Sequence, residues 1–363
     1  MLLTRKSKII IAVVAVCISL AIIIPAILYQ LKEDKRSRED VRQARIDKFH
    51  MYASTSHTAL EEARAFLKEN GIPTPLFADL TQKAGFTPPK ICIGIQTAAR
   101  KVSPINYLEQ TVGSLLARMK LPDDDIYIHV FNVQDPSIYH KDIESVQDLV
   151  PVTSTKGQLP AEINVPMIPQ YAEAHDHLEA MRVLMKIGCK YPILIEDDAL
   201  PQIGWVDQIR KAIDQLEKRG TDWFVVKLYI ARKPQDERKN KSYVGITDFD
   251  QGFNGVALMY NPLHMLRYGD SLVQHTREVM AGRLGKEHYE FKDTYMHYFK
   301  KMGYAIEAFE PPIFQHTGIY SSVNNRPLDK FPWYMESREF VSENVPIKFD
   351  ANLWQGLLQK KQA

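Results

Sequence analysis

Three consecutive acidic residues, Glu196-Asp197-Asp198, are the strongest candidates for a functional site in this 363-residue sequence. They directly follow the apolar run Tyr191 to Ile195, which is typical of a buried strand. Three like charges at one point are costly unless a cation neutralises them. Carboxylates combined with phosphate oxygens hold hard divalent ions such as Mn²⁺ or Mg²⁺. The run therefore predicts a metal site, with a solvated acidic turn that caps the next helix as the alternative.

A second group that could bind the same ion is His316, which follows the turn Glu310-Pro311-Pro312. A neutral imidazole is a good ligand for Mn²⁺. The residues after it include Gly318, and a small residue lets the backbone approach a phosphate. A lone histidine in a turn is also often an ordinary hydrogen-bonded polar residue, so both interpretations stay open at this point.

The elements that must position these residues alternate along the chain. Apolar and β-branched runs predict strands, and segments with helical periodicity predict helices between them. The predicted strands are residues 90–96, 125–132, 191–195 and 223–229, and the predicted helices are residues 107–120, 171–187 and 205–218. This alternation predicts an α/β fold with a mostly parallel sheet. Ligands of such sheets lie at the carboxyl ends of the strands, where the acidic run begins.

The start of the chain predicts a membrane anchor. Residues 9–28 form an almost unbroken apolar run, which as a helix would span about 30 Å, the thickness of the hydrocarbon core. Arg5, Lys6 and Lys8 precede it, so the positive-inside rule leaves the N-terminus in the cytosol. A cleaved signal peptide is the alternative, but its apolar region is usually shorter. We expect a single-pass type II protein of the Golgi or endoplasmic reticulum membrane, with a lumenal catalytic domain.

These observations give a domain plan. Residues 1–8 would be a cytosolic tail, residues 9–29 the anchor, residues 30–89 a helical stem and residues 90–363 the catalytic domain. The stem is expected because a charged segment with helical periodicity ends at Asn70-Gly71, and we expect it to pack loosely on the body.

Composition and cysteine usage narrow the possible partners. The 46 basic and 44 acidic residues give a net charge of only +2, so we expect no nucleic-acid partner. In the oxidising lumen, Cys92 and Cys189 could form a disulfide or remain buried free thiols, and the sequence does not decide between them. Asn240-Lys241-Ser242 is an acceptor sequence for N-glycosylation at Asn240.

Several segments together resemble a known family. The sequence is similar to the inverting GT-A glycosyltransferases that include the N-acetylglucosaminyltransferase IV family. It more closely resembles the Golgi N-acetylgalactosamine transferases that modify GPI glycans. The resemblance covers about residues 90–323, and its acidic run is specific only in combination with the C-terminal piece. The similar segments are Tyr191–Pro201, Val226–Tyr229, Gly255–Tyr260, Lys292-Asp293 and Glu310–Ser322.

The resemblance implies a Rossmann-like GT-A fold and a metal-dependent inverting transfer. The donor would be UDP-GalNAc or UDP-GlcNAc, and the acceptor a glycan, above all that of GPI-anchored proteins. Asp198 and His316 would bind Mn²⁺ or Mg²⁺. Glu196 and Asp197 would contact the ribose or the donor sugar.

The resemblance also suggests further roles. Asp293 would be the catalytic base, although an Asp at the start of a helix is also a common N-cap. Thr97 and Arg100, which follow the first predicted strand, and Lys227 on a neighbouring strand would contact the donor. The alternative for Arg100 is a solvated loop arginine.

One feature departs from the GPI-modifying relatives, which carry a transmembrane hairpin within the catalytic domain. Here the corresponding segment, Tyr229 to Gly255, is short and polar, so the way of meeting a membrane-bound acceptor would differ. Three rival functions remain at this stage: an N-glycan-branching enzyme, a non-catalytic binding protein with the GT-A shape, and a metal-dependent hydrolase.

Overall fold

The computed structural model describes most of the chain beyond the predicted anchor. The described residues are 40, 43–44, 46–77, 88–100, 103, 105–121, 125–134, 137–155, 169–220, 222–230, 245–248, 255–284, 292–318 and 346–362. The chain divides into two compact units, residues 1–50 and residues 51–363, and the fold below is that of the second. Within the described ranges, no helix has the length and apolarity needed to cross a membrane. The predicted anchor, residues 9–29, lies outside them.

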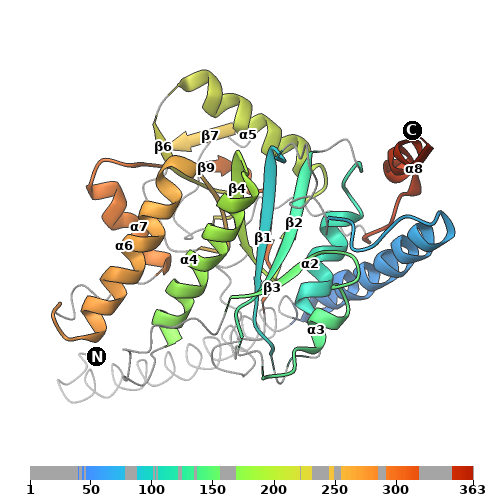
Figure 1. Cartoon of the computed structure of the whole chain (residues 1–363), viewed down its shortest axis with the longest axis horizontal. Helices are drawn as coiled ribbons and strands as arrows, with labels where there is room; N and C mark the ends of the chain where they lie inside the picture. Colours follow the sequence, from blue (N-terminus) through green and yellow to red (C-terminus); the bar gives the residue numbers. More distant parts are fainter. Residues whose placement is uncertain are drawn as a thin grey trace, which may run out of the picture. The chain divides into compact units, whose positions relative to one another are not determined.

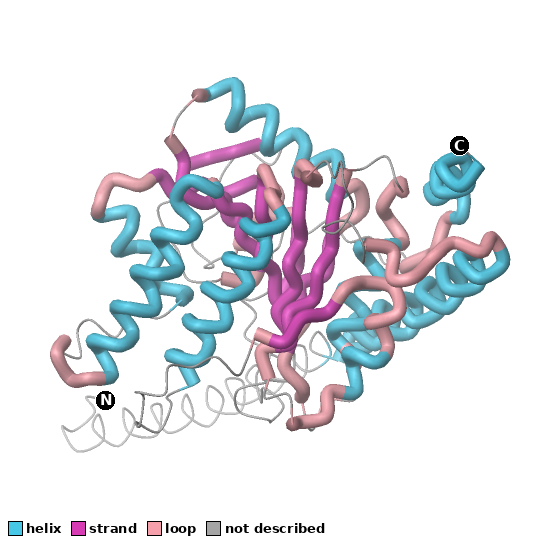
Figure 2. The backbone as a smooth tube through the Cα atoms, in the orientation of Figure 1, coloured by secondary structure: helices cyan, strands magenta, loops and turns pink. Residues whose placement is uncertain are grey.

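The centre of the second unit is a mixed sheet of eight strands in the order β3-β2-β1-β4-β8-β6-β9-β7. Figure 2 shows its strands in magenta. Its strands are β1 (Ile91–Thr97), β2 (Ile126–Asn132), β3 (Val152–Ser154), β4 (Tyr191–Glu196), β6 (Trp223–Lys227), β7 (Gly245–Asp248), β8 (Ala257–Tyr260) and β9 (Ala305–Glu310). The strands β3, β2, β1 and β4 are parallel neighbours, as are β6 and β9. β8 is antiparallel to β4 and β6, and β7 is antiparallel to β9. The predicted α/β class is confirmed, whereas the sheet is mixed, with a parallel part formed by β3, β2, β1 and β4.

Helices flank this sheet, with α4, α6 and α7 on one side and α2 and α3 on the other (Figure 1). Their bounds are α2 (Tyr107–Leu116), α3 (Lys141–Glu144), α4 (Pro169–Ile187), α5 (Trp205–Arg219), α6 (Pro262–Met280), α7 (Lys292–Lys301), the 3-10 helix η3 (Ala351–Trp354) and α8 (Gln355–Gln362). The helices predicted at 107–120, 171–187 and 205–218 are therefore present with small shifts of their ends. Two short strands, β5 (Ala199–Pro201) and β10 (Phe314–His316), pair separately.

The strand β1 is buried on both faces, which explains its nearly continuous apolar sequence. Its Gly94 lies between Leu194 of β4 and Phe131 of β2. A β-carbon at this position would be 2.7 Å from each of those side chains. The missing side chain therefore lets the neighbouring strands fill this part of the core with large residues.

Residues 51–69 form a helix that packs tightly on the body. Its Leu60, Ala63 and Leu67 are buried members of the main hydrophobic core. Gly113 of α2 permits this approach, because a β-carbon there would lie 2.9 Å from the carbonyl oxygen of Ser56. Our expectation of loose packing was therefore wrong for this part of the predicted stem, since its periodic apolar residues enter the core.

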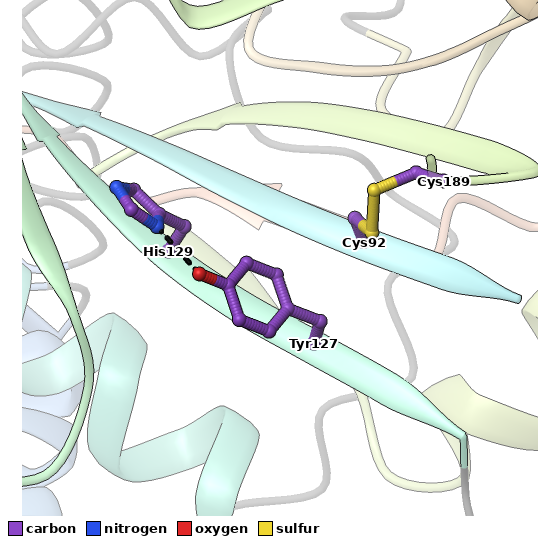
Figure 3. Close-up of a disulfide and its surroundings, with 4 residues drawn as sticks. All are labelled: Cys92, Tyr127, His129 and Cys189. Carbon is purple, nitrogen blue, oxygen red and sulfur yellow. Dashed lines mark hydrogen bonds between the residues drawn. A yellow bond between two sulfur atoms is a disulfide. The ribbon is translucent and has the colours of Figure 1, made fainter. Parts of the chain in front are cut away.

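Cys92 of β1 and Cys189, just before β4, form a disulfide with a Cα–Cα distance of 5.8 Å (Figure 3). Their burial alone was compatible with free thiols, and only the fold brings the two residues together. Cys92 lies opposite Tyr127 in the register of β1 and β2. The Tyr127 hydroxyl in turn hydrogen-bonds His129 Nδ1 at 2.8 Å. The disulfide therefore links β1 to the residues just before β4, whereas the Tyr127–His129 hydrogen bond lies within β2.

Candidate active site

The acidic run begins at the last residue of β4 and continues into the turn before β5. β5 pairs antiparallel with β10, which places His316 opposite Ala199. His316 Nε2 consequently lies 3.3 Å from Asp198 Oδ2, although the two residues are far apart in the sequence. The two segments that we expected to share a site are thus brought together by this small sheet.

Glu196, Asp198 and His316 form a group that could hold a metal ion. Each offers one ligand atom, and these atoms all lie within 4.8 Å of one another. Asp198 is buried, and its Oδ1 has no hydrogen-bond partner among the described residues. Carboxylate oxygens with an imidazole nitrogen suit Mn²⁺ and related divalent ions. The residues therefore fit a metal, and Glu196, which we expected at the donor sugar, lies with the two predicted ligands.

Gly318 makes this arrangement sterically possible. A β-carbon there would clash with Asp198 Oδ2 and would lie 2.8 Å from His316 Nε2. No other residue type leaves the space between these two groups open. The sequence indicated a small residue that admits a phosphate, whereas in the structure its immediate neighbours are two candidate metal ligands.

Two threonines fix the backbone of the acidic run. Thr317 donates to the Asp198 carbonyl oxygen from its backbone N–H at 2.9 Å and from its hydroxyl at 3.0 Å. Thr111 of α2 donates its hydroxyl to the Asp197 carbonyl oxygen at 2.6 Å. Sequence reasoning missed both residues. Nothing local distinguishes such threonines, because their partners are distant in the chain.

Arg100 is the counterion of the acidic run. Its guanidinium bonds both carboxylate oxygens of Asp197, at 2.8 and 2.7 Å, and Asp198 Oδ2 at 2.9 Å. Burial alone would lower the pKa of Arg100, but the Asp197 and Asp198 carboxylates outweigh it and raise the pKa above its ordinary value. With a side chain only 7% exposed, Arg100 is not a solvated loop arginine. Its predicted contact with the donor stays a prediction.

Both carboxylate oxygens of Asp197 bond to side chains of the protein. Thr97 donates its hydroxyl to Asp197 Oδ2 at 2.6 Å, so the single proton of that hydroxyl is used. His140 Nε2, 3.1 Å from the same hydroxyl oxygen, must then be the donor of the second hydrogen bond. This arrangement fixes the side chain of Asp197 beneath Arg100. Its predicted contact with the donor is untested, as is that of Thr97.

The charges of the candidate ligands are coupled. Burial opposes ionisation of Asp198, but His316 and Arg100 lower its pKa below the ordinary range. Burial likewise opposes protonation of His316, while Asp198 raises its pKa. Each of the two residues therefore stabilises the charged form of the other. The buried ring of Tyr229 lies 6.1 Å from that of His316, and burial, followed by the Asp198 and Glu196 charges, raises the pKa of Tyr229.

The remaining predicted residues lie elsewhere or beyond description. Lys227 is on β6 and only 1% exposed, so a donor could reach it only if neighbouring groups moved. Asp293 is the second residue of α7, whereas the resemblance implied an acidic residue just before a helix, and its side chain is outside the described residues. Asn240 also lies outside the described residues, so its glycosylation stays a prediction.

Comparison with known sequences supports the resemblance. Residues 91–240 match the family described as GPI-N-acetylgalactosamine transferase PGAP4. The similarity to the GPI-modifying transferases is thereby confirmed over a segment that contains β1, β4 and the acidic run. No curated protein matches the chain.

Solved structures show only weak similarity. TarS 1–349 from S. aureus in complex with UDP-GlcNAc is 10% identical, with 50% of this chain and 47% of TarS covered and a TM-score of 0.31. Mannose-1-phosphate geranyltransferase from Thermus thermophilus is 12% identical, with coverages of 61% and 73% and a TM-score of 0.31. CMP:2-keto-3-deoxy-manno-octonic acid synthetase complexed with CTP is 13% identical, with coverages of 61% and 89% and a TM-score of 0.34. Structural similarity at this level does not establish a shared function.

Proposed function

We propose that this chain, a glycosyltransferase, moves GalNAc or GlcNAc from a UDP-sugar to the glycan of a GPI anchor. The match of residues 91–240 to the GPI-N-acetylgalactosamine transferase family supports both the reaction and the acceptor. The matched segment contains Glu196, Asp197 and Asp198, together with Thr97 and Arg100. The part of the chain that matches the family therefore includes the acidic run and the arginine that pairs with it.

The proposed site is metal-dependent. The observation that carries this is the group of Glu196, Asp198 and His316, together with Asp198 Oδ1, which has no hydrogen-bond partner in the described ranges. A bound Mn²⁺ or Mg²⁺ would stabilise the charge that develops on the departing UDP. In the chain itself, Thr111 and Thr317 hold the backbone carbonyls of the acidic run by hydrogen bonds. Arg100 supplies a buried positive charge beside the carboxylates. These contacts preorganise the site before the donor binds.

The first experiment measures UDP release from UDP-GalNAc and UDP-GlcNAc by residues 32–363, with Mn²⁺ and with a chelator. We expect one donor to be used, and only with metal. Absence of both hydrolysis and transfer with every donor would refute the proposed activity. Formation of free sugar without any glycan product would instead identify a hydrolase. Comparison of GPI glycans and N-glycans from cells lacking the protein would identify the acceptor, and a change confined to N-glycans would refute the GPI assignment.

We propose Asp293 as the base that takes the proton of the acceptor hydroxyl, because it is a carboxylate in the first turn of α7 within a segment that resembles the family. Asp293→Asn should leave binding of UDP with Mn²⁺ unchanged and lower transfer by about 100-fold or more. Asp207→Asn, which removes an exposed carboxylate from the start of α5, is the matched control. Transfer by the Asp293 variant at near the wild-type rate would place the base elsewhere.

We further propose that residues 9–29 anchor the protein as a type II protein of the Golgi membrane. The support is the apolar run with its preceding basic residues. Protease protection in sealed membrane vesicles should spare residues 30–363, and endoglycosidase treatment should shift the mass of wild-type protein but not of Asn240→Gln. Digestion of the catalytic domain in sealed vesicles would contradict the proposed topology and place this domain on the cytosolic side.

A further inference from the structure

A cavity of about 1040 Å³ lies beside the candidate active site. Its wall is formed by residues from the loops after β1 and β2, from α3 and from the helix of residues 51–69. Arg100 lines this cavity and also bonds Asp197 and Asp198. The cavity is therefore connected to the acidic run by a single side chain.

Most carboxylates of the cavity wall are already paired with protein groups. The pairs are Arg64 with Glu61 and Asp148, His57 with Glu109, and the Tyr139 hydroxyl with Glu144. Since basic and acidic groups are both present, the described residues of the wall form no strongly positive surface. A phosphate group would gain little there, and an uncharged ligand suits the wall better.

Asp142 is the exception among these carboxylates. It lines the cavity and is half-buried, yet among the described residues its carboxylate has neither a hydrogen bond nor an ion pair. Burial, with a smaller contribution from the charge of Asp197, raises the pKa of Asp142 to about 6. A partly desolvated carboxylate without donors is energetically costly. Hydroxyl groups of a ligand would relieve that cost by donating to it.

Tyr139 provides an apolar surface at the same cavity. Its side chain is 66% exposed, although a large aromatic residue usually buries more of its surface. Its hydroxyl donates to Glu144 at 2.6 Å, which restricts the orientation of the ring. An oriented, exposed aromatic ring at the same cavity as a carboxylate that has no partner among the described residues suits a ligand ring with one apolar face and hydroxyls on its edge.

We propose that this cavity binds an uncharged, hydroxyl-bearing ring that packs on Tyr139 and donates hydrogen bonds to Asp142. The inference rests on the proposed function, which offers two sources of such a ring: the ribose of the donor nucleotide and a sugar unit of the acceptor glycan. Neither residue was singled out by the sequence, and neither belongs to the group around Asp198.

The test uses Asp142→Asn, which keeps the size of the side chain but removes its charge, with Asp207→Asn as control. Affinity for UDP with Mn²⁺ is measured by calorimetry and the acceptor KM by transfer assay. Loss of a hydrogen bond to a charged group should weaken one of them about tenfold. Weaker UDP binding would identify the ring bound in the cavity as the ribose of the donor. A raised acceptor KM would identify it as a sugar unit of the acceptor. If both values stay within twofold of wild type, the inference is overturned.

A second measurement does not depend on catalysis. Saturation-transfer NMR is recorded with uridine, methyl mannoside and methyl N-acetylgalactosaminide on the wild type and on Tyr139→Ala. We expect ring-proton signals from at least one probe with the wild type and their loss with the variant. Equal signals from both proteins, or none from the wild type, would overturn the inference. A wild type that gives these signals but never releases UDP would refute the proposed function and leave the cavity assignment standing.

Discussion

A strand of the central sheet and the turn after another of its strands both bury ionisable side chains, but the hydrogen bonding of these side chains differs. At the Tyr127–His129 region, on β2, His129 Nδ1 bonds the Tyr127 hydroxyl and Nε2 bonds the Thr153 hydroxyl, each at 2.8 Å. Both ring nitrogens are thus satisfied. Burial lowers the pKa of His129 to about 4, so the ring is neutral under physiological conditions.

The acidic run is the opposite case. Asp198 remains charged in a buried position, and one of its oxygens has no partner in the part of the chain that the structure describes. The neighbouring Gly318 leaves space where any side chain would collide. Complete hydrogen bonding marks the first region as structural, whereas the incomplete set marks the second as a place for a ligand.

The largest effect is expected from the disulfide next to Tyr127. Replacing both Cys92 and Cys189 by Ala should lower the free energy of unfolding by about 2 to 5 kcal/mol, because the bridge closes a loop with a sequence separation of 97 residues. Urea unfolding without reductant measures this. The folded variant should keep its kcat, and a lowered kcat at full folding would contradict the structural role of this region.

The second prediction concerns Asp198. Asp198→Asn should weaken Mn²⁺-dependent binding of UDP by more than about 100-fold, since changes even beyond the direct ligands of a metal cost about 10- to 100-fold. Calorimetry with Mn²⁺ and with chelator measures the change, with Asp207→Asn as control. Unchanged binding by a folded variant would show that the metal is held elsewhere.

The third prediction tests the space beside the ligands. Gly318→Ala should destabilise the metal-bound folded protein by about 1 to 3 kcal/mol, because the new methyl group overlaps Asp198 Oδ2. We expect most of this cost to appear as metal affinity lowered by about tenfold, with a smaller fall in the urea midpoint. Wild-type affinity for Mn²⁺ would mean that Asp198 and His316 need not stay close.

The fourth prediction is a pH dependence of stability. The folded-state pKa of His129, about 4, lies below the ordinary value of 6.5, so its stabilising contribution is complete above pH 6.5 and is lost as the pH falls toward 4. Between pH 7 and pH 4.5 this loss amounts to about 2 kcal/mol. His129→Gln should reduce the acid sensitivity of urea unfolding by that amount. An identical pH dependence in the variant would argue against a neutral, buried His129.

The smallest effects come from a matched pair of threonines. Thr317→Val and Thr153→Val should each lower the free energy of unfolding by about 1 kcal/mol, the usual value for one hydrogen bond. Only Thr317→Val should also reduce metal affinity, since Thr317 holds the Asp198 carbonyl while Thr153 holds His129. Equal effects on metal binding would remove the distinction between the two regions.

The main strands could be predicted from the sequence because burial on both faces requires continuous apolar runs, as at Ile91–Thr97 and Tyr191–Glu196. Shorter strands such as β5, β7 and β10 escaped prediction. With three or four residues each, they carry no periodic signal, and they exist through pairing with distant segments. The missed β10 matters most, since it brings His316 to Asp198.

By itself, the sequence indicated an acidic run directly after a buried strand, for which a metal site and a solvated turn both stayed open, because the partners of such a run lie far away in the chain. It also determined the α/β class through its hydrophobic periodicity. Tertiary structure alone decided that Arg100 pairs with Asp197 and Asp198, that Gly318 lies against Asp198, and that Cys92 bonds Cys189. Each of these contacts joins residues that are far apart in the sequence, where only packing fixes distance and direction.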